Sequence, residues 1–321
     1  MELDPKENLL EVLKFGSPEY VPYSRAMPVK TIGFYGVNPD DNRPGAEKNW
    51  TDLWQVRHRK EMEDVMPFPA YHPLEHLGNW DEYAWHDPAL YSRARQAIQV
   101  IPDRDHIILS GSHRSTLLER AWKLVGMDNL FVMMLNEPEK ANWLLDHIIE
   151  FQLGVAEEYG ALGVQMAALG DDQGTQLALL VSPELFREYF KPRYRRLIDY
   201  YKSRACIVQF HSCGNIIELV PDFIDLGIDI LNPAQATANN LNELREKTAG
   251  KITLSGAVST ATILQGPREA IRAEARQRIT SLGKLGGYIC GPDQGMPFPD
   301  DNIADLQQAV AEFGVYPLPV N

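Results

Sequence analysis

Short apolar runs alternate with amphipathic stretches along the chain from about residue 100 onward. The apolar runs have the length of buried strands, and the stretches between them carry apolar residues at helical spacing. The apolar runs are HIILSGS, FVMMLNEP, VQMAALGDD, IVQFHSCGN, IDILNP, ITLSGAVS and GGYICGPDQ. The predicted helices cover Ser115–Val125, Glu137–Tyr159, Pro183–Lys202, 215–226, Leu241–Lys247, Pro267–Leu282 and Asp301–Phe313.

Strands that alternate with helices predict βαβ units and a parallel sheet. With one N-terminal strand the count reaches about eight, which favours a closed (β/α)8 barrel over a doubly wound sheet. A dinucleotide-binding fold is disfavoured because no G-x-G-x-x-G motif follows the first strand, and no P-loop motif occurs. We therefore predict an α/β fold, a single (β/α)8 TIM barrel, with residues 1–321 as one domain.

The N-terminal part of the chain departs from this rhythm. Asp4 and Pro5 begin a predicted helix, because Asp caps free N–H groups and Pro fits the first helical turn. The run VPYSRA predicts a strand, and residues 38–92 are rich in Pro, Trp, Tyr and His, as in a long excursion over a core. We expect residues 1–95 to form a strand, a helix and a long loop excursion packed on the barrel, and residues 96–321 to hold the regular β/α repeats.

The formal net charge of −13 argues against nucleic acid or an anionic membrane surface as a partner. An anionic small substrate is still compatible with this charge, because a local group of arginines can face a cleft. Three cysteines, Cys206, Cys213 and Cys290, suit a reducing cytoplasm better than a disulfide framework. The N-terminus lacks the pattern of a signal peptide, and no apolar run approaches the ~20 residues that span a bilayer. We expect a soluble, cytoplasmic protein.

Polar residues gather where the predicted strands end. In a barrel the loops after these ends hold the active site, so residues that are far apart in the sequence converge there. The candidates are Asp171, Asp172, His211, Cys213, Asn215, Asn232, Gln235, Ser255, Ser259, Cys290, Asp293 and Gln294.

The His211-Ser-Cys213 unit is the sharpest of these features. Residues i and i+2 of a strand point the same way, so the imidazole and the thiolate could share one ion. Zinc takes nitrogen and sulfur ligands, and its catalytic sites have three protein ligands and an open position. Cys290 could supply the third ligand. Strand alternation could instead turn Cys290 away from the mouth, and Asp293 or Gln294 would then face the site.

The segment GDDQGTQ places Asp171 and Asp172 beside glycines at a strand end. Such carboxylates could bind a cation, orient a substrate or act as a general base. Helix capping is the alternative. Because the next predicted helix starts at Pro183, well beyond the pair, we expect one of the two aspartates to have a functional role.

Several of these segments together resemble the uroporphyrinogen decarboxylase superfamily, over roughly the last two-thirds of the chain. They are FHSCGNIIELVPDFIDLGIDILNPAQ, GDDQGTQ, SPELFREYFKPRYRRLID, ITLSGAVST and GGYICGPDQGMPFPDDNI. The resemblance implies a (β/α)8 barrel. Its true decarboxylases carry an arginine-bearing R-Q-A-G-R motif and an F-S-D-I-type aspartate, where this chain has VPYSRAMPVK and PFPAYHPLE.

The other branch of the superfamily, the methylcobamide-dependent methyltransferases, is closer in motif. These enzymes hold zinc with a His-x-Cys pair, matched here by His211 and Cys213, and with a later cysteine in a P-G-C-G-like stretch. Here that stretch reads Pro292-Asp293-Gln294-Gly295, so Gln294 occupies the place of the cysteine, and Cys290 lies four residues earlier.

The resemblance implies a zinc-assisted methyltransferase that moves a methyl group between a methylcobamide on a corrinoid protein and a small thiol or related acceptor. We expect His211, Cys213 and Cys290 as metal ligands, Asp171 and Asp172 as catalytic residues, and a substrate-binding set. That set is Asn215, Asn232, Gln235 and Gln294. The alternatives are a lyase that acts on a porphyrinogen or aromatic carboxylate, with arginines such as Arg25 at the mouth, and a corrinoid- or small-molecule-binding protein without turnover.

Overall fold

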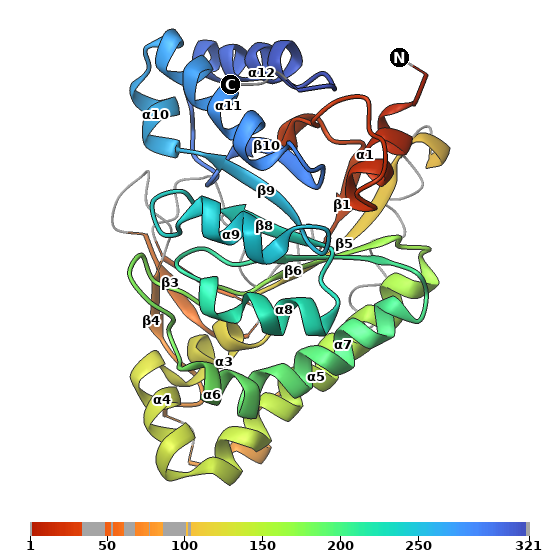
Figure 1. Ribbon diagram of the computed structural model, residues 1–321. Coiled ribbons are helices and arrows are strands. Elements are labelled where there is room, and N and C mark those ends of the chain that lie inside the picture. Colours follow the sequence, from red (N-terminus) through yellow and green to blue (C-terminus); the bar gives the residue numbers. More distant parts are fainter. Residues whose placement is uncertain are drawn as a thin grey trace.

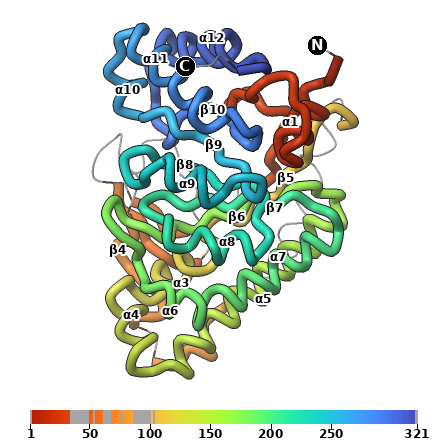
Figure 2. The backbone as a smooth tube through the Cα atoms, in the orientation of Figure 1, coloured from red at the N-terminus to blue at the C-terminus, as the bar shows by residue number. Residues whose placement is uncertain are grey.

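A seven-stranded parallel sheet forms the centre of the molecule. The computed structural model describes residues 2–33, 49–52, 54–60, 68–76, 78–85, 101 and 104–318. The sheet order is β1-β5-β6-β7-β8-β9-β10. The strands are β1 Val29–Ile32, β5 Ile108–Arg114, β6 Met166–Gly170, β7 Ile207–His211, β8 Ile230–Ala234, β9 Thr253–Val258 and β10 Tyr288–Pro292. Tyr23, just before β1, makes a parallel bridge to Cys290, so the curled sheet returns to its own N-terminal segment. The predicted barrel-type α/β fold is confirmed (Figures 1 and 2).

Helices cover the outside of this sheet, with the long α5 and α7 side by side (Figure 1). They are α1 Pro5–Leu13, α3 Leu118–Val125, α4 Met127–Asn136, α5 Pro138–Ala161, α6 Pro183–Leu185, α7 Lys191–Lys202, α8 Val220–Leu226, α9 Leu241–Thr248, α10 Thr260–Gln265, α11 Arg268–Leu282 and α12 Asp300–Phe313. Shorter turns are η1 Ser24–Ala26, η2 Trp80–Glu82, η4 Arg104–His106, η6 Ile217–Leu219 and the π-helical η5 Phe186–Phe190. None of the described helices is both long and apolar enough to cross a membrane.

Two predicted strands differ from the structure. The run FVMMLNEP lies largely in helix α4, where Leu130, Met133 and Met134 are buried at the i, i+3, i+4 spacing of a helix. The run VPYSRA contributes only the bridge at Tyr23 before it turns into η1, and the N-terminal strand of the sheet is β1.

Helix α1 covers the end of the curled sheet at which the strands begin. Leu9 and Val12 of this helix form one buried cluster with inward-facing residues of the strands, among them Ile108, Met166 and Ile289. The helix begins as predicted: the Asp4 carboxylate accepts the backbone N–H of Glu7, and the Glu7 side chain accepts the N–H of Asp4, which completes a capping box. The cluster also shows which face of each strand points inward, because side chains alternate along a strand.

The N-terminal excursion forms a small antiparallel sheet of β2 Asn49–Thr51, β3 Arg57–Arg59 and β4 Phe68–Tyr71. Figure 1 shows this sheet on the left of the molecule and α1 on the right. Trp54, next to the sheet, is 1% exposed and packs edge-on against Phe151 of α5. The excursion therefore packs on the barrel at this point. We predicted a single domain with a boundary at residue 95 between the excursion and the β/α repeats. This boundary lies outside the described residues and stays a prediction.

Candidate metal centre at the barrel mouth

Three side chains of different chemistry meet at the ends of β6 and β7. His211 Nε2 lies 3.6 Å from Cys213 Sγ and 3.8 Å from Asp172 Oδ1. The three donor atoms all lie within 4.8 Å of one another, and within the described ranges no other cluster of His, Cys, Asp and Glu meets this condition. Nitrogen, sulfur and oxygen ligands of a tetrahedral zinc ion lie about 3.5 Å apart at the usual bond lengths. The donor set and its spacing therefore fit a zinc ion with an open position.

Backbone hydrogen bonds hold the loops after β6, β7 and β8 in register at this end. The Cys213 N–H donates to Asp172 Oδ1 at 2.7 Å, and the Asp171 N–H donates to the carbonyl of His211 at 3.0 Å. The Gly214 N–H donates to the side-chain oxygen of Gln235 at 2.8 Å. Asp172 thus has two contacts with the His-x-Cys unit, which fix its carboxylate beside the imidazole and the thiol.

A pair of glycines lets the β6 and β7 loops touch backbone to backbone. Gly214 has a φ of 87°, and a Cβ added there would lie 2.3 Å from the carbonyl carbon and oxygen of Gly174. No side chain fits this contact without moving one of the loops. The contact brings Asp172 and Cys213 together.

Asn232 of β8 sets the orientation of the His211 ring. Its side-chain oxygen lies 2.7 Å from His211 Nδ1, and its amide nitrogen donates to Ser255 Oγ at 3.4 Å. The amide oxygen can only accept, so Nδ1 carries the proton and the Nε2 lone pair faces Cys213 and Asp172. Asn232, predicted to bind substrate, therefore lies behind His211, in the position that carboxylates and carbonyls take behind metal-binding histidines.

Burial raises the pKa of the Cys213 thiol to about 12, and the nearby carboxylates of Asp172 and Glu119 act in the same direction. A hydrogen bond from Gln294 acts in the opposite direction and lowers this pKa. The carboxylates make the surroundings of the sulfur negative, so a bound cation would compensate this charge. Glu119 was missed from the sequence, because it reaches the site through a contact between α3 and the β6 loop.

Asp171 has a different environment from its neighbour. It is fully buried, and its carboxylate accepts the backbone N–H groups of Leu117, Leu118 and Glu119 at 2.7–2.8 Å. The Tyr194 hydroxyl donates to the same carboxylate. Burial and the Glu119 carboxylate raise the pKa of Asp171 to about 7 against these hydrogen bonds. Asp171 thus caps the start of α3, which has no capping side chain of its own, and its catalytic role stays a prediction.

Cys290 does not lie in the cluster of Asp172, His211 and Cys213. Ile289 belongs to the inward cluster of the barrel, so its neighbour Cys290 points to the opposite face of β10, among the outer core residues. Cys290 is fully buried, and this burial raises its pKa to about 12. The structure brings Asp172, and not Cys290, to His211 and Cys213.

The remaining predicted residues support the loops. Asn215 accepts the N–H of Ile217 at 3.4 Å, and its own N–H donates to Thr175. Gln235 is 4% exposed and holds the Gly214 N–H. Asn239, which was not predicted, accepts the Ile216 N–H at 3.1 Å and donates to the Gly214 carbonyl at 2.9 Å.

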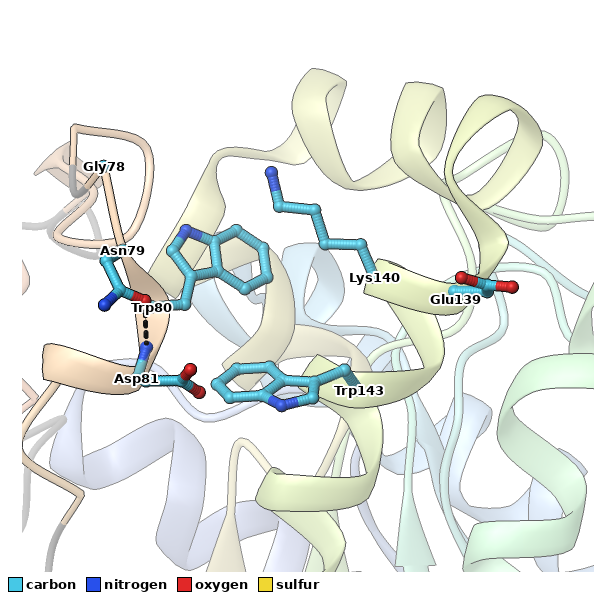
Figure 3. Close-up of a pocket in the computed structure, with 7 residues that line it drawn as sticks. All are labelled: Gly78, Asn79, Trp80, Asp81, Glu139, Lys140 and Trp143. Atoms are coloured by element: carbon cyan, nitrogen blue, oxygen red, sulfur yellow. Dashed lines mark hydrogen bonds between the residues drawn. The ribbon is translucent and has the colours of Figure 1, made fainter.

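Two hollows lie on the N-terminal excursion, away from the metal group. One, of about 340 Å³, lies between η2 and the start of α5, and is shown in Figure 3. In it Lys140 Nζ lies 4.4 Å from the centre of the Trp80 ring, and the Trp80 and Trp143 rings are 5.7 Å apart. The other, of about 510 Å³, is lined by the small sheet, with Arg57 over Tyr71 at 4.0 Å.

Comparison with known proteins gives consistent matches. The sequence model of the family described as "Uroporphyrinogen decarboxylase (URO-D)" matches residues 118–313, more than half of the chain. A methylated-thiol–coenzyme M methyltransferase of Methanosarcina mazei is 24% identical over 193 residues, which cover 60% of this chain and 50% of that protein. A uroporphyrinogen decarboxylase of Anaeromyxobacter dehalogenans is 26% identical over 191 residues, covering 59% and 53%. The match thus spans about half the length of these curated relatives.

Among solved structures, a methyltransferase from Methanosarcina mazei superposes with a TM-score of 0.72 at 19% identity. The superposition covers 97% of this chain and 99% of that chain. At this identity the likeness concerns the fold, and it extends over the N-terminal excursion as well as the barrel.

Proposed function

The chain belongs to the uroporphyrinogen decarboxylase family, and we propose that within this family it is a zinc-assisted methyltransferase. It would move a methyl group between a methylcobamide, carried by a corrinoid protein, and a small thiol or related acceptor. The observation that carries the proposal is the group of Asp172, His211 and Cys213 at the barrel mouth. A decarboxylase of tetrapyrroles has no need of such a donor set.

Asp172, His211 and Cys213 would hold the zinc, and one coordination position would stay open for the acceptor. Bound zinc would supply a deprotonated, nucleophilic thiolate near neutral pH. Asn232 would keep the Nδ1 proton of His211 in place, so that Nε2 stays free as a ligand. Gln294, which lowers the pKa of the Cys213 thiol, would be the polar group next to the acceptor.

One relative supports a thiol as the methyl acceptor, and the resemblance of the His-x-Cys unit supports the corrinoid donor. The similar Methanosarcina mazei protein is named for transfer from methylated thiols to coenzyme M, and the resemblance of the His-x-Cys unit points to the corrinoid-dependent branch. The group of Asp172, His211 and Cys213 lies at the ends of the strands, where a barrel presents its reactive groups to a partner. The acidic net charge of −13 supports a small molecule and a protein, rather than nucleic acid, as partners.

The test is metal analysis combined with a transfer assay. We expect about one zinc ion per purified chain and thiol-dependent consumption of methylcobalamin. Asp172→Ala, His211→Ala and Cys213→Ala should lose both, whereas the exposed Asp199→Ala on α7 should lose neither. An intact protein without stoichiometric zinc, or one that decarboxylates uroporphyrinogen and transfers no methyl group, would overturn the proposal.

A further inference from the structure

Arg114 ends strand β5 in the same cross-strand row as His211. The register pairs Arg114 with Gly170 of β6, and Gly170 with His211 of β7. Gly170 has no side chain, and the atom nearest to a Cβ built there is the Arg114 Cα, at 3.7 Å. Only a glycine therefore separates the arginine from His211, a proposed metal ligand, along the rim of the sheet.

The alternation along β5 turns Arg114 toward the barrel interior. Ile108 belongs to the inward cluster that α1 closes. His113 faces the helices, where its ring contacts Gln152 of α5 and Tyr201 of α7. The inward positions of β5 are therefore Ile108, Ser110, Ser112 and Arg114.

The inward side of β5 carries polar groups that have no hydrogen-bond or ion-pair partner among the described residues. The Ser110 hydroxyl is fully buried and has no hydrogen-bond partner among the described residues. Arg114 is exposed at the rim and makes no ion pair within the described part of the chain. By contrast, Arg187, Arg193 and Arg268 each lie 2.7–3.0 Å from a carboxylate. A cation without its own counter-ion beside the site is available for a charged ligand.

We propose that Arg114 is a specificity-determining residue that binds the acid group of an anionic thiol acceptor. This inference rests on the function proposed above. A guanidinium group matches a carboxylate or sulfonate with two parallel hydrogen bonds. Strands β5 and β7 are two strand spacings apart, about 10 Å, and the arginine side chain takes up part of that span. The acceptor it fits is short, with two or three carbons between thiol and acid.

The experiment compares two thiols of the same size by calorimetry on the zinc-loaded protein. The acid is 3-mercaptopropionate and its neutral counterpart is 3-mercaptopropionamide. We expect the acid to bind about ten-fold or more tightly than the amide. Arg114→Gln should remove this preference without change in zinc content or amide affinity, and Arg114→Lys should restore part of it. Arg276→Gln, on the exposed side of α11, is the matched control.

A second probe separates this inference from the proposed function. Butyrate carries the acid group but no thiol, and its contact with the protein is measured by saturation-transfer NMR on the metal-free chain. Butyrate binding that is lost in Arg114→Gln supports the assignment even if no thiol is methylated. An unchanged preference for the acid in Arg114→Gln, or no binding of either acid to the wild-type protein, would overturn it.

Discussion

The Nδ1 atom of His211 lies 2.7 Å from the side-chain oxygen of Asn232, on the neighbouring strand β8. This single contact fixes both the proton position and the plane of the ring, because an amide oxygen can only accept. The Nε2 atom is thereby directed to the carboxylate of Asp172 and the thiol of Cys213. The geometry of the site therefore depends on Asn232, which is not one of the three candidate metal ligands.

Replacing Asn232 should therefore weaken zinc binding without removing a ligand. Asn232→Ala leaves the ring free to rotate and to change tautomer, and we expect a loss of about 10- to 100-fold in zinc affinity. Competition with a chromogenic chelator measures it. Asn242→Ala, on the exposed surface of α9, is the control. Equal zinc affinity in both variants would show that Asn232 does not orient the ring.

The adjacent aspartates should separate stability from metal binding. Asp171→Ala would leave three backbone N–H groups, two of them buried, and the Tyr194 hydroxyl without their acceptor. We expect the free energy of unfolding to fall by at least about 3 kcal/mol. Asp172→Ala should retain its stability and lose zinc. Urea unfolding and metal analysis of both variants test this, and a fully stable Asp171→Ala would contradict the capping role.

The sequence predicted those features of the site that depend on neighbouring residues. His211 and Cys213 are separated by one residue at a strand end, so their proximity follows from strand geometry alone. The barrel was likewise predictable, because the alternation of strands and helices is a pattern of local sequence periodicity. The first five residues of the run FVMMLNEP are all apolar, so their periodicity does not distinguish a strand from the helix α4.

The choice between Cys290 and Asp172 required the three-dimensional structure. Strand β10 reads YICGP, with no polar residue to show which face is inward. The face of β10 that points inward is set by the packing of Ile289 with α1, and these segments come from opposite ends of the chain. Asp172 reaches the site through the close approach of Gly174 and Gly214, which the sequence alone does not reveal. The role of Asp171 as the cap of α3 likewise depends on where that helix begins in space.

His113 should make stability depend on pH. Burial lowers its pKa from 6.5 to about 4, although the hydrogen bond with Gln152 acts in the other direction. As the pH falls from 6.5 toward 4, the unfolded chain takes up this proton first, so the folded state loses stability over that window. The loss from this residue should reach about 3 kcal/mol.

The difference between wild type and His113→Gln isolates this effect from other titrating groups. Glutamine does not titrate, so the free energy of unfolding of the variant should approach that of the wild type as the pH falls through the window. The exposed His76→Gln should parallel the wild type throughout. Urea unfolding at several pH values measures both, and a constant difference for His113→Gln would show that this histidine is not neutral in the folded protein.

Cys290→Ala should leave the metal site intact. Cys290 is fully buried on the outer face of β10, and its backbone N–H donates to the Pro22 carbonyl at 2.9 Å, a contact that alanine keeps. Loss of the sulfur should cost roughly 1–2 kcal/mol of stability through a small cavity. Zinc content and affinity should equal those of the wild type, whereas Cys213→Ala should lose the metal. A folded Cys290→Ala protein without zinc would mean that β10 shifts its phase when the ion binds, and that the later cysteine is a ligand after all.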